Sequence, residues 1–483
     1  MRVAGIHIQE EKKDLKIQHA VSEPYGLEMI LAVAKQEGHD VDLFVAGEQK
    51  ETVEKISAFK PDIAAFSLYT LQYNTGKNIA AELKRRIPNL TVVAGNRYPT
   101  FLKEKIEQPF DFFVIKEGEE SFRELLSAIG DGHNYEDIRG LVFRKNNQPV
   151  FTGVRERKFD LDSLPDALRF PVILNQVYKA VSIPPLSSCP HYAVIESSRC
   201  CYNNCKFCDN NGFWGNKVVA RSHRRVVDEM AKLKERGVDI FYFMDLNFTA
   251  FPERARELCN KMIEQKLNAN WYCMSNVSTL DSQEGRDLLS LMKEAGCFKI
   301  AYGIESTNDS ALKKMNKRVG KNFAKTEQAI RVLESSLRAG MINQGFYIIG
   351  FPWETAESIV RDSQKLKNIP IHQLNIGIFT PIPLSRFYNE MVQEGYVIDA
   401  NLEHHDRNTL VFNHKGLCKT MGNPNEDMNN GNKVLKLIQE RICLEFYSSP
   451  EFISRVKRTC DIDPRFRKSF NDYFEFTGKE MRI

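Results

Sequence analysis

The sequence predicts an α/β protein: a doubly wound, Rossmann-like domain, then a partial (β/α)6 barrel of the TIM type, then a mostly helical C-terminal segment. Two series of short apolar stretches alternating with amphipathic helical stretches predict the first two parts, because such alternation favours parallel sheets. The third part is rich in helical and aromatic residues. We place the domain boundaries at residues 1–135, 136–185 (hairpin and linker), 186–385 and 386–483.

The first series occupies the N-terminal domain. Its predicted strands are residues 3–8, 41–45, 62–70, 91–95 and 111–118, and its clearest helices are 25–38 and 76–87. In an open parallel sheet, ligands bind beyond the carboxyl ends of the strands. We therefore expect a binding site at the loops 67–74, 95–100 and 117–120.

The segment between the two series contains a hairpin. Two apolar stretches flank a polar turn in residues 140–155, which is typical of a β-hairpin. Residues 159–171 are predicted to be a linker. Near the other end of the chain, the Asn- and Gly-rich stretch 421–432 predicts a loop.

The second series predicts the barrel. Its strands are residues 192–198, 240–248, 268–277, 298–306, 341–350 and 374–383. The active site of a parallel barrel lies at the carboxyl ends of its strands. Cysteines follow the first of these strands, and Asp, Asn, Ser and Glu residues end the next three. The polar groups are therefore expected at one mouth.

Composition limits the class of protein. The chain is 42% hydrophobic and 27% charged, with a net charge of +4, which implies no polyanionic partner such as a nucleic acid. We expect no membrane span, since no apolar stretch reaches about 18 residues. An odd total of 11 cysteines argues against a secreted disulfide scaffold and favours a reducing cytoplasm.

Four of these cysteines lie within "SSRCCYNNCKFC", residues 197–208. Cys201, Cys205 and Cys208 have the spacing C-x3-C-x2-C, which fits a [4Fe–4S] cluster with one iron left open. A structural zinc site is the alternative, but it usually needs four ligands. Cys200 is a poor fourth ligand, because adjacent side chains diverge. Buried apolar thiols are a further alternative, but the loop is polar.

These residues resemble the radical SAM enzymes, whose related branch has a motif close to S-R-G-C-P-Y-N-C-x-F-C. The resemblance extends over roughly residues 193–385, through "RSHRRVVDEMAKLKERGVDIFYFMDLNFT", "LLSLMKEAGCFKIAYGIES" and "GFYIIGFPWET". It implies that the three spaced cysteines hold the cluster and that Cys200, where Gly is usual, is a spectator. The open iron would bind the amino and carboxylate groups of S-adenosylmethionine (SAM).

The resemblance also implies a set of SAM-binding residues at the strand ends. Asp245 and Asn247 are expected near the amino group of SAM. Ser275, Asn276 and Glu305 are expected to hydrogen-bond its carboxylate or its ribose hydroxyls. A helix N-cap or a surface ion pair is the alternative for Asp245 and Glu305. The bulky Phe351 and Trp353 are expected to wall the adenine or the substrate. The complete cofactor-binding set in the barrel is Asp245, Asn247, Ser275, Asn276, Glu305 and Phe207, which precedes the last cysteine.

The N-terminal domain resembles the cobalamin-binding domain of one radical SAM branch. The similar stretches are "YGLEMILAVAKQEGHDVDLF", "PDIAAFSL", "VVAGNRYPT" and "IKEGEESFREL". Cobalamin contacts are then expected at Ser67, Thr70, Gly95 and Gly118. "AGNRYPT" departs from the usual G-G-x-H-P-T, so Arg97 and Tyr98 could fill that space instead, and "DGHNYE" (131–136) only partly resembles the motif D-x-H-x-x-G. The alternative is a domain that has lost the cofactor and serves as a lid.

The combined resemblance implies a function. It predicts methyl transfer to an unactivated carbon or to phosphorus of a small-molecule substrate, such as a natural-product or lipid intermediate. The electron would come from an external donor such as flavodoxin or ferredoxin. A radical cyclisation, rearrangement or ring contraction without methyl transfer is the second prediction, and a non-catalytic iron–sulfur protein the third. His404, His405 and Cys418 are left open as ligands, acid–base groups or exposed side chains.

Overall fold

The computed structural model describes residues 1–9, 23–132, 134–157, 160–171, 191–401, 404–417 and 424–476. These residues form two compact units, the first ending at residue 171 and the second beginning at residue 191. The predicted boundary at 185/186 lies outside the described residues. Among the described helices, none is both long and apolar enough to cross a membrane.

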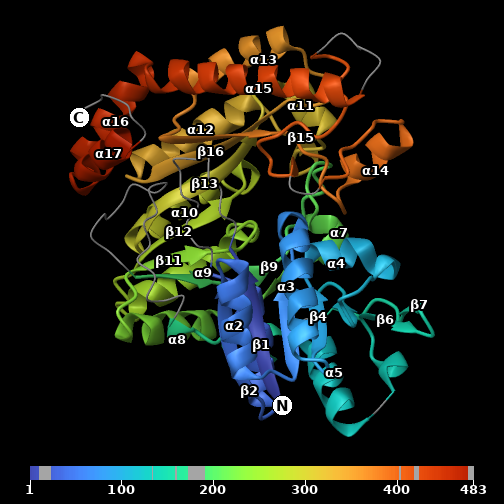
Figure 1. Cartoon of the computed structure of the whole chain (residues 1–483). Helices are drawn as coiled ribbons and strands as arrows, with labels where there is room; N and C mark the ends of the chain where they lie inside the picture. Colours follow the sequence, from blue (N-terminus) through green and yellow to red (C-terminus); the bar gives the residue numbers. More distant parts are fainter. Residues whose placement is uncertain are drawn as a thin grey trace. The chain divides into compact units, whose positions relative to one another are not determined.

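The first unit is built on one seven-stranded sheet in the order β2-β1-β3-β4-β5-β6-β7 (Figure 1). Strands β1 to β5 are parallel, as predicted, and their order is that of a doubly wound fold. The strands are β1 (Arg2–Ile8), β2 (Asp40–Ala46), β3 (Ile63–Ser67), β4 (Thr91–Gly95), β5 (Phe112–Val114), β6 (Leu141–Lys145) and β7 (Gln148–Phe151).

The predicted hairpin is β6–β7. It extends this sheet, because β6 pairs with β5 antiparallel. Sequence patterning identified the hairpin but not the strand to which it pairs, since that pairing is a long-range contact.

Helices cover both faces of the sheet. α1 packs against α5 and contributes to the apolar core on one face, and α2 packs against α3. The helices are α1 (Tyr25–Gln36), α2 (Gln49–Phe59), α3 (Tyr73–Arg86), α4 (Arg97–Leu102) and α5 (Glu119–Asp131). The fold thereby leaves the loops after β3, β4 and β5 at one edge of the sheet.

The second unit holds a parallel six-stranded sheet in the order β17-β16-β13-β12-β11-β8. The six strands are those predicted: β8 (Tyr192–Ile195), β11 (Ile240–Phe243), β12 (Asn270–Ser275), β13 (Cys297–Glu305), β16 (Ile342–Ile349) and β17 (Gln373–Ile378). β8 and β17 lie at opposite ends of the order, so the barrel is partial.

Helices follow the strands of this partial barrel. They are α8 (His223–Glu235), α9 (Pro252–Glu264), α10 (Gln283–Glu294), α11 (Asp309–Lys314), α12 (Thr326–Arg338) and α13 (Ala356–Ser363). The short α7 (Asn210–Trp214) follows the segment that carries the four clustered cysteines, residues 200–208, which we call the cysteine loop. Two short antiparallel pairs complete the fold: β9 (Ser198–Arg199) with β10 (Val219–Ala220), and β14 (Arg318–Val319) with β15 (Asn322–Phe323).

The C-terminal segment is helical, as predicted, and its apolar residues join the core of the second unit. Its helices are α14 (Arg386–Gln393), α15 (Pro424–Tyr447), α16 (Pro450–Ile462) and α17 (Arg465–Phe476). The loop predicted at 421–432 is wrong from residue 424 onwards, where α15 begins. Proline is well accommodated at a helix start, and Glu426 and Asp427 suit the positive end of the helix dipole.

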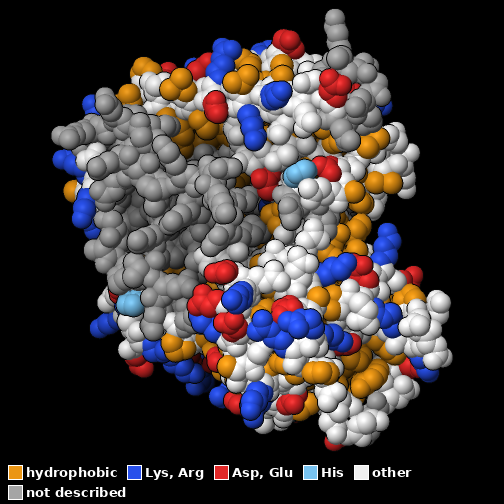
Figure 2. Space-filling model, in the orientation of Figure 1, with side chains coloured by type: hydrophobic (Ala, Val, Ile, Leu, Met, Phe, Trp, Pro, Cys, Tyr) orange, Lys and Arg blue, Asp and Glu red, His pale blue; other side chains and the backbone are white. Residues whose placement is uncertain are grey.

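The visible surface carries mixed charges. On the face drawn in Figure 2, Lys and Arg side chains are interspersed with Asp and Glu rather than gathered in one patch. This distribution fits the small net charge of the chain.

Candidate functional site

The cysteine loop begins just after β8 and the two-residue strand β9. Cys205 is buried and Cys201 and Cys208 are half-buried. The backbone N–H of Cys208 donates to the carbonyl oxygen of Cys205 at 3.2 Å, which closes the turn between them. Burial raises the pKa of the Cys205 thiol to about 11, and the positive charge of Lys317 opposes that shift. A metal would favour the thiolate form of these cysteines.

Cys200 differs from its neighbours. Its φ is +83°, a conformation that favours glycine, and its side chain is 1% exposed. Its thiol donates to the carbonyl oxygen of Gly215 at 3.2 Å, on the segment that follows α7. The side chain therefore has a structural contact of its own, in keeping with the predicted spectator role.

The donor set fits a cluster better than a single ion. Within the described ranges, no three His, Cys, Asp or Glu side chains converge as ligands of one metal ion. In a [4Fe–4S] cube each cysteine binds a different iron, so its ligands do not meet in one tetrahedral shell. Three spaced thiols, with no fourth ligand among the residues that the structure describes, are the number that a cube with one open iron requires.

Asp245, two residues after the end of β11, binds the residues just ahead of the cysteine loop. It is fully buried, and its carboxylate accepts hydrogen bonds from the N–H and hydroxyl of Ser197 and from the hydroxyl of Ser198, at 2.5–2.8 Å. Arg254 donates to the carbonyl oxygen of Ser197 at 2.7 Å. These contacts give Asp245 a positioning role, and its direct contact with SAM stays a prediction.

The ends of β11 and β12 meet, as the sequence predicts. Asn247 Oδ1 accepts from the N–H of Asn276 at 3.0 Å. Thr249, which sequence reasoning missed, hydrogen-bonds the hydroxyls of both Ser275 and Thr279. Asn247 Nδ2 is buried and has no hydrogen-bond partner among the described residues. Because an N–H group donates, it suits the carboxylate or a ribose oxygen of SAM rather than the amino group near which Asn247 is predicted to lie, and its contact with SAM stays a prediction.

Glu305, at the end of β13, forms a buried ion pair that the sequence did not reveal. Its Oε1 accepts from Lys317 Nζ at 3.0 Å, and both residues are under 9% exposed. A register irregularity lies between Gly303 and Glu305, whose φ is +64°. A Cβ on Gly303 would lie 2.3 Å from Glu305 Oε1 and 2.8 Å from Lys317 Nζ. The glycine therefore makes room for the pair.

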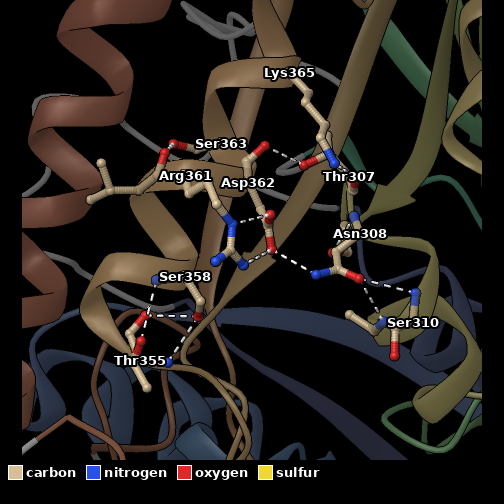
Figure 3. Close-up of polar contacts among 12 residues, drawn as sticks. Thr307, Asn308, Ser310, Thr355, Ser358, Arg361, Asp362, Ser363 and Lys365 are labelled. Carbon is tan, nitrogen blue, oxygen red and sulfur yellow. Dashed lines mark hydrogen bonds and ion pairs between the residues drawn. The ribbon is translucent and has the colours of Figure 1, made fainter.

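A polar network holds the turn that follows Glu305. Asn308 Nδ2 donates to Asp362 Oδ2 at 2.7 Å, while Asn308 Oδ1 caps α11 by accepting from the N–H groups of Ser310 and Ala311 (Figure 3). Thr307 donates its hydroxyl to the carbonyl oxygen of Asp362. These bonds join the start of α11 to the end of α13 and so fix the end of β13.

The "GFPWET" loop contributes its aromatic side chains to the apolar core of the second unit. The Phe351 ring is fully buried and stacks on Trp353 at 4.8 Å and on Phe379 at 4.4 Å. The expectation that Phe351 lines the adenine or substrate is therefore wrong, because its ring has no exposed surface, whereas the same expectation for the half-buried Trp353 stays a prediction. Glu354 accepts from the N–H groups of Gly350 and Phe351, and burial raises its pKa to about 7. Phe207 packs against the same core.

The predicted cobalamin residues gather at one edge of the first unit. Ser67 pairs in register with Gly95, and its hydroxyl accepts from Asn96 Nδ2 at 2.9 Å. Thr70 begins a short 3-10 turn, Thr70–Gln72, three residues after the end of β3. At Gly118 a Cβ would lie 3.2 Å from Ile30 and Val114 side chains, so a larger residue would crowd this edge.

Small side chains at this edge fit a large flat ligand. Tyr98, a departure from the family motif, does not occupy the space at this edge. Its ring is buried against the ring of Tyr73, with the two ring centroids 4.9 Å apart. The residue belongs to the packing of α4 on α3, and the residues present are compatible with a corrinoid.

The histidines left open by the sequence have local partners. His404 Nδ1 contacts Asp399 at 2.6 Å, and His405 Nε2 contacts the carbonyl oxygen of the same residue at 2.8 Å. Both therefore stabilise a turn. Cys418 and His133 of "DGHNYE" lie outside the described residues.

Comparisons with known proteins identify both domains. Residues 195–366 match the family described as the radical SAM superfamily, and residues 19–126 match the B12 binding domain. The chain therefore contains a radical SAM domain. Its N-terminal part is a B12-binding domain, and the two domains together imply the three predicted cofactors: a [4Fe–4S] cluster, SAM and cobalamin.

Three similar proteins illustrate the range of the family. An uncharacterized methyltransferase of Pyrococcus horikoshii is 27% identical over 78% of this chain and 80% of its own. The anaerobic magnesium-protoporphyrin IX monomethyl ester cyclase of Cereibacter sphaeroides is 25% identical over 72% of this chain, which spans 56% of that longer protein. The radical SAM methyltransferase TsrM of Kitasatospora setae, solved with cobalamin and a [4Fe–4S] cluster, is 15% identical; the match covers 91% of this chain and 88% of that one, with a TM-score of 0.70.

Proposed function

We propose that this protein is a cobalamin-dependent radical SAM methyltransferase acting on an unactivated carbon, or on phosphorus, of a small-molecule substrate. The observation that carries the proposal is the joining of a cysteine loop, set in a partial barrel among buried strand-end polar groups, to a B12-binding domain in one chain. The relatives named as methyltransferases support it. When bound, the cluster and cobalamin supply electron transfer, radical generation and methyl-group carriage.

The residues of the barrel would bind and orient SAM. Cys201, Cys205 and Cys208 would each hold one iron and leave the fourth for the amino and carboxylate groups of SAM. Asn247 Nδ2, which has no protein partner among the described residues, would donate to the SAM carboxylate or ribose. The surrounding apolar core would exclude water from the radical.

The proposal includes partners of defined chemistry. A small-molecule substrate, such as a natural-product or lipid intermediate, would enter the barrel. A low-potential protein such as flavodoxin or ferredoxin would supply electrons, and a reducing cytoplasm would keep the cysteine thiols reduced.

A second candidate is a radical cyclase or ring-rearranging enzyme without methyl transfer. The similarity to the magnesium-protoporphyrin ester cyclase favours it. A non-catalytic iron–sulfur protein is the weakest candidate, because an electron carrier has no need of the buried polar groups at three strand ends.

The test is product analysis. Protein reconstituted anaerobically with iron, sulfide and hydroxocobalamin is incubated with SAM and a reductant. The proposal predicts both 5′-deoxyadenosine and S-adenosylhomocysteine. 5′-Deoxyadenosine alone would favour the second candidate, and neither product the third. Cys205→Ala is the negative control, and Cys200→Ala is its match in the same loop.

A further inference from the structure

The segment Met315–Lys317 is pinned onto the cysteine loop. The N–H of Lys206, next to Cys205, donates to the carbonyl oxygen of Met315 at 2.9 Å. Asn316 Nδ2 donates to the carbonyl oxygen of Asn204 at 2.7 Å. These two hydrogen bonds, one on each side of Cys205, therefore fix the position of Lys317 relative to the loop that would hold the cluster.

The Lys317 ammonium is fixed on its other side by Glu305. The 3.0 Å ion pair is buried, and the missing side chain of Gly303 provides its space. The charge of Lys317 favours the thiolate forms of Cys205 and Cys201. A buried cation, paired with a carboxylate, therefore lies near two of the three predicted cluster ligands.

A charge at the position of Lys317 would affect the reduction potential of the cluster directly. Three thiolates give an iron–sulfur cube a net negative charge, which increases when the cube takes up an electron. Nearby charge, hydrogen bonding and solvent exposure set the reduction potential of such clusters. A cation buried beside the cube stabilises the reduced form, since Coulomb interactions are strong where the dielectric constant is low. An anion has the opposite effect.

We propose that the Lys317–Glu305 pair sets the reduction potential of the [4Fe–4S] cluster, with Lys317 raising it and Glu305 limiting the rise. The inference rests on the proposed function, in which one electron from an external flavodoxin- or ferredoxin-type donor reduces the cluster before SAM is cleaved. Lys317 acts through the cluster and is a positioning residue. Its charge makes that one-electron reduction easier for the donor.

The experiment is a redox titration of the reconstituted full-length protein, without SAM, followed by the electron paramagnetic resonance signal of the reduced cluster. Lys317→Met should shift the midpoint potential to a more negative value. Glu305→Gln should shift it in the opposite direction, and Lys317→Arg should restore it nearly to wild type. Lys206→Met is the matched control: this lysine lies in the same loop but is more exposed and paired with Glu390, so its removal should shift the potential little.

Opposite shifts in Lys317→Met and Glu305→Gln, at equal iron content, would be specific to charge, because a damaged cluster site would move both variants in the same direction. An unchanged potential in both variants would overturn the proposal. Loss of iron from both would also overturn it, since the pair would then hold the loop rather than tune the cluster. The proposed function is tested by a different result: it fails if the wild-type protein forms no 5′-deoxyadenosine.

Discussion

At the scale of single residues, Cys200 shows how a family motif can change without losing its geometry. The backbone there adopts φ +83°, which costs a residue with a Cβ about 1–2 kcal/mol. Cys200→Gly should therefore retain the cluster. Relief of the backbone strain is offset by loss of the buried thiol and its hydrogen bond to Gly215, so the free energy of unfolding should change by less than about 1 kcal/mol. Iron content, absorbance and thermal denaturation check it. Cys205→Ala should lose the cluster, and a comparable loss in Cys200→Gly would contradict the assignment of ligands.

Lys299 is a second residue whose chemistry the fold determines. It lies on β13, is 2% exposed, and contacts Gln373 at 3.4 Å and the face of Tyr272 at 4.9 Å. Burial lowers its pKa from 10.5 to about 7. The folded state therefore holds this proton less tightly than the unfolded chain. Stability is lost as the pH falls from about 10 to 7 and then stays constant.

Lys299→Met should remove that loss. We expect the free energy of unfolding to increase by about 1–4 kcal/mol below pH 7, and by less as the pH approaches 10. Denaturant unfolding at several pH values measures it, with the exposed Lys457→Met as control. A gain that is independent of pH would show that Lys299 is not buried as a charge.

At the scale of the elements, the strand ends of the barrel differ in role. Asp245 binds three donors of Ser197 and Ser198, ahead of the cysteine loop. Asp245→Ala leaves those buried donors unpaired, which should cost about 2–4 kcal/mol. The loop should lose order, so iron content and SAM affinity should fall together. Full iron content with weakened SAM binding would instead indicate direct contact with SAM.

Asn247, two residues later, should behave differently. Its Nδ2 has no partner among the described residues and would donate to SAM. Asn247→Ala should keep the cluster and weaken SAM binding about ten- to hundredfold, the value of a hydrogen bond to a charged group. Equilibrium binding to the reconstituted protein measures it. Asn270→Ala, at the opposite end of β12, is the matched control, and equal losses in both variants would place the SAM site elsewhere.

The structure also separates what sequence patterns predict from what they do not. Alternating apolar stretches predicted every parallel strand of both sheets, because each such strand must bury two faces. Lys317 was missed, since it lies 12 residues after Glu305 and only the fold brings them together. The helix at 424 was missed because its Asn- and Gly-rich start is locally unfavourable, and its later apolar residues, packed on the barrel, compensate.

At the scale of the whole molecule, the account joins two domains with complementary chemistry. The barrel supplies the cysteine loop and the buried polar groups for SAM, and the N-terminal sheet supplies an edge with small residues at Ser67, Gly95 and Gly118. Neither domain alone accounts for methyl transfer, since the radical and the methyl group come from different cofactors. Retention of a corrinoid by this chain is therefore the decisive property.

The most direct test is cobalamin retention coupled to methyl accounting. The full-length protein is reconstituted with hydroxocobalamin, desalted and examined for its corrin spectrum, then reduced and supplied with SAM labelled in the methyl group. We predict stoichiometric corrin after desalting, transfer of label to the bound corrinoid and equivalent release of S-adenosylhomocysteine. A protein that shows no corrin absorbance after desalting but still cleaves SAM to 5′-deoxyadenosine would contradict methyl transfer and leave a radical enzyme of the cyclising or rearranging type.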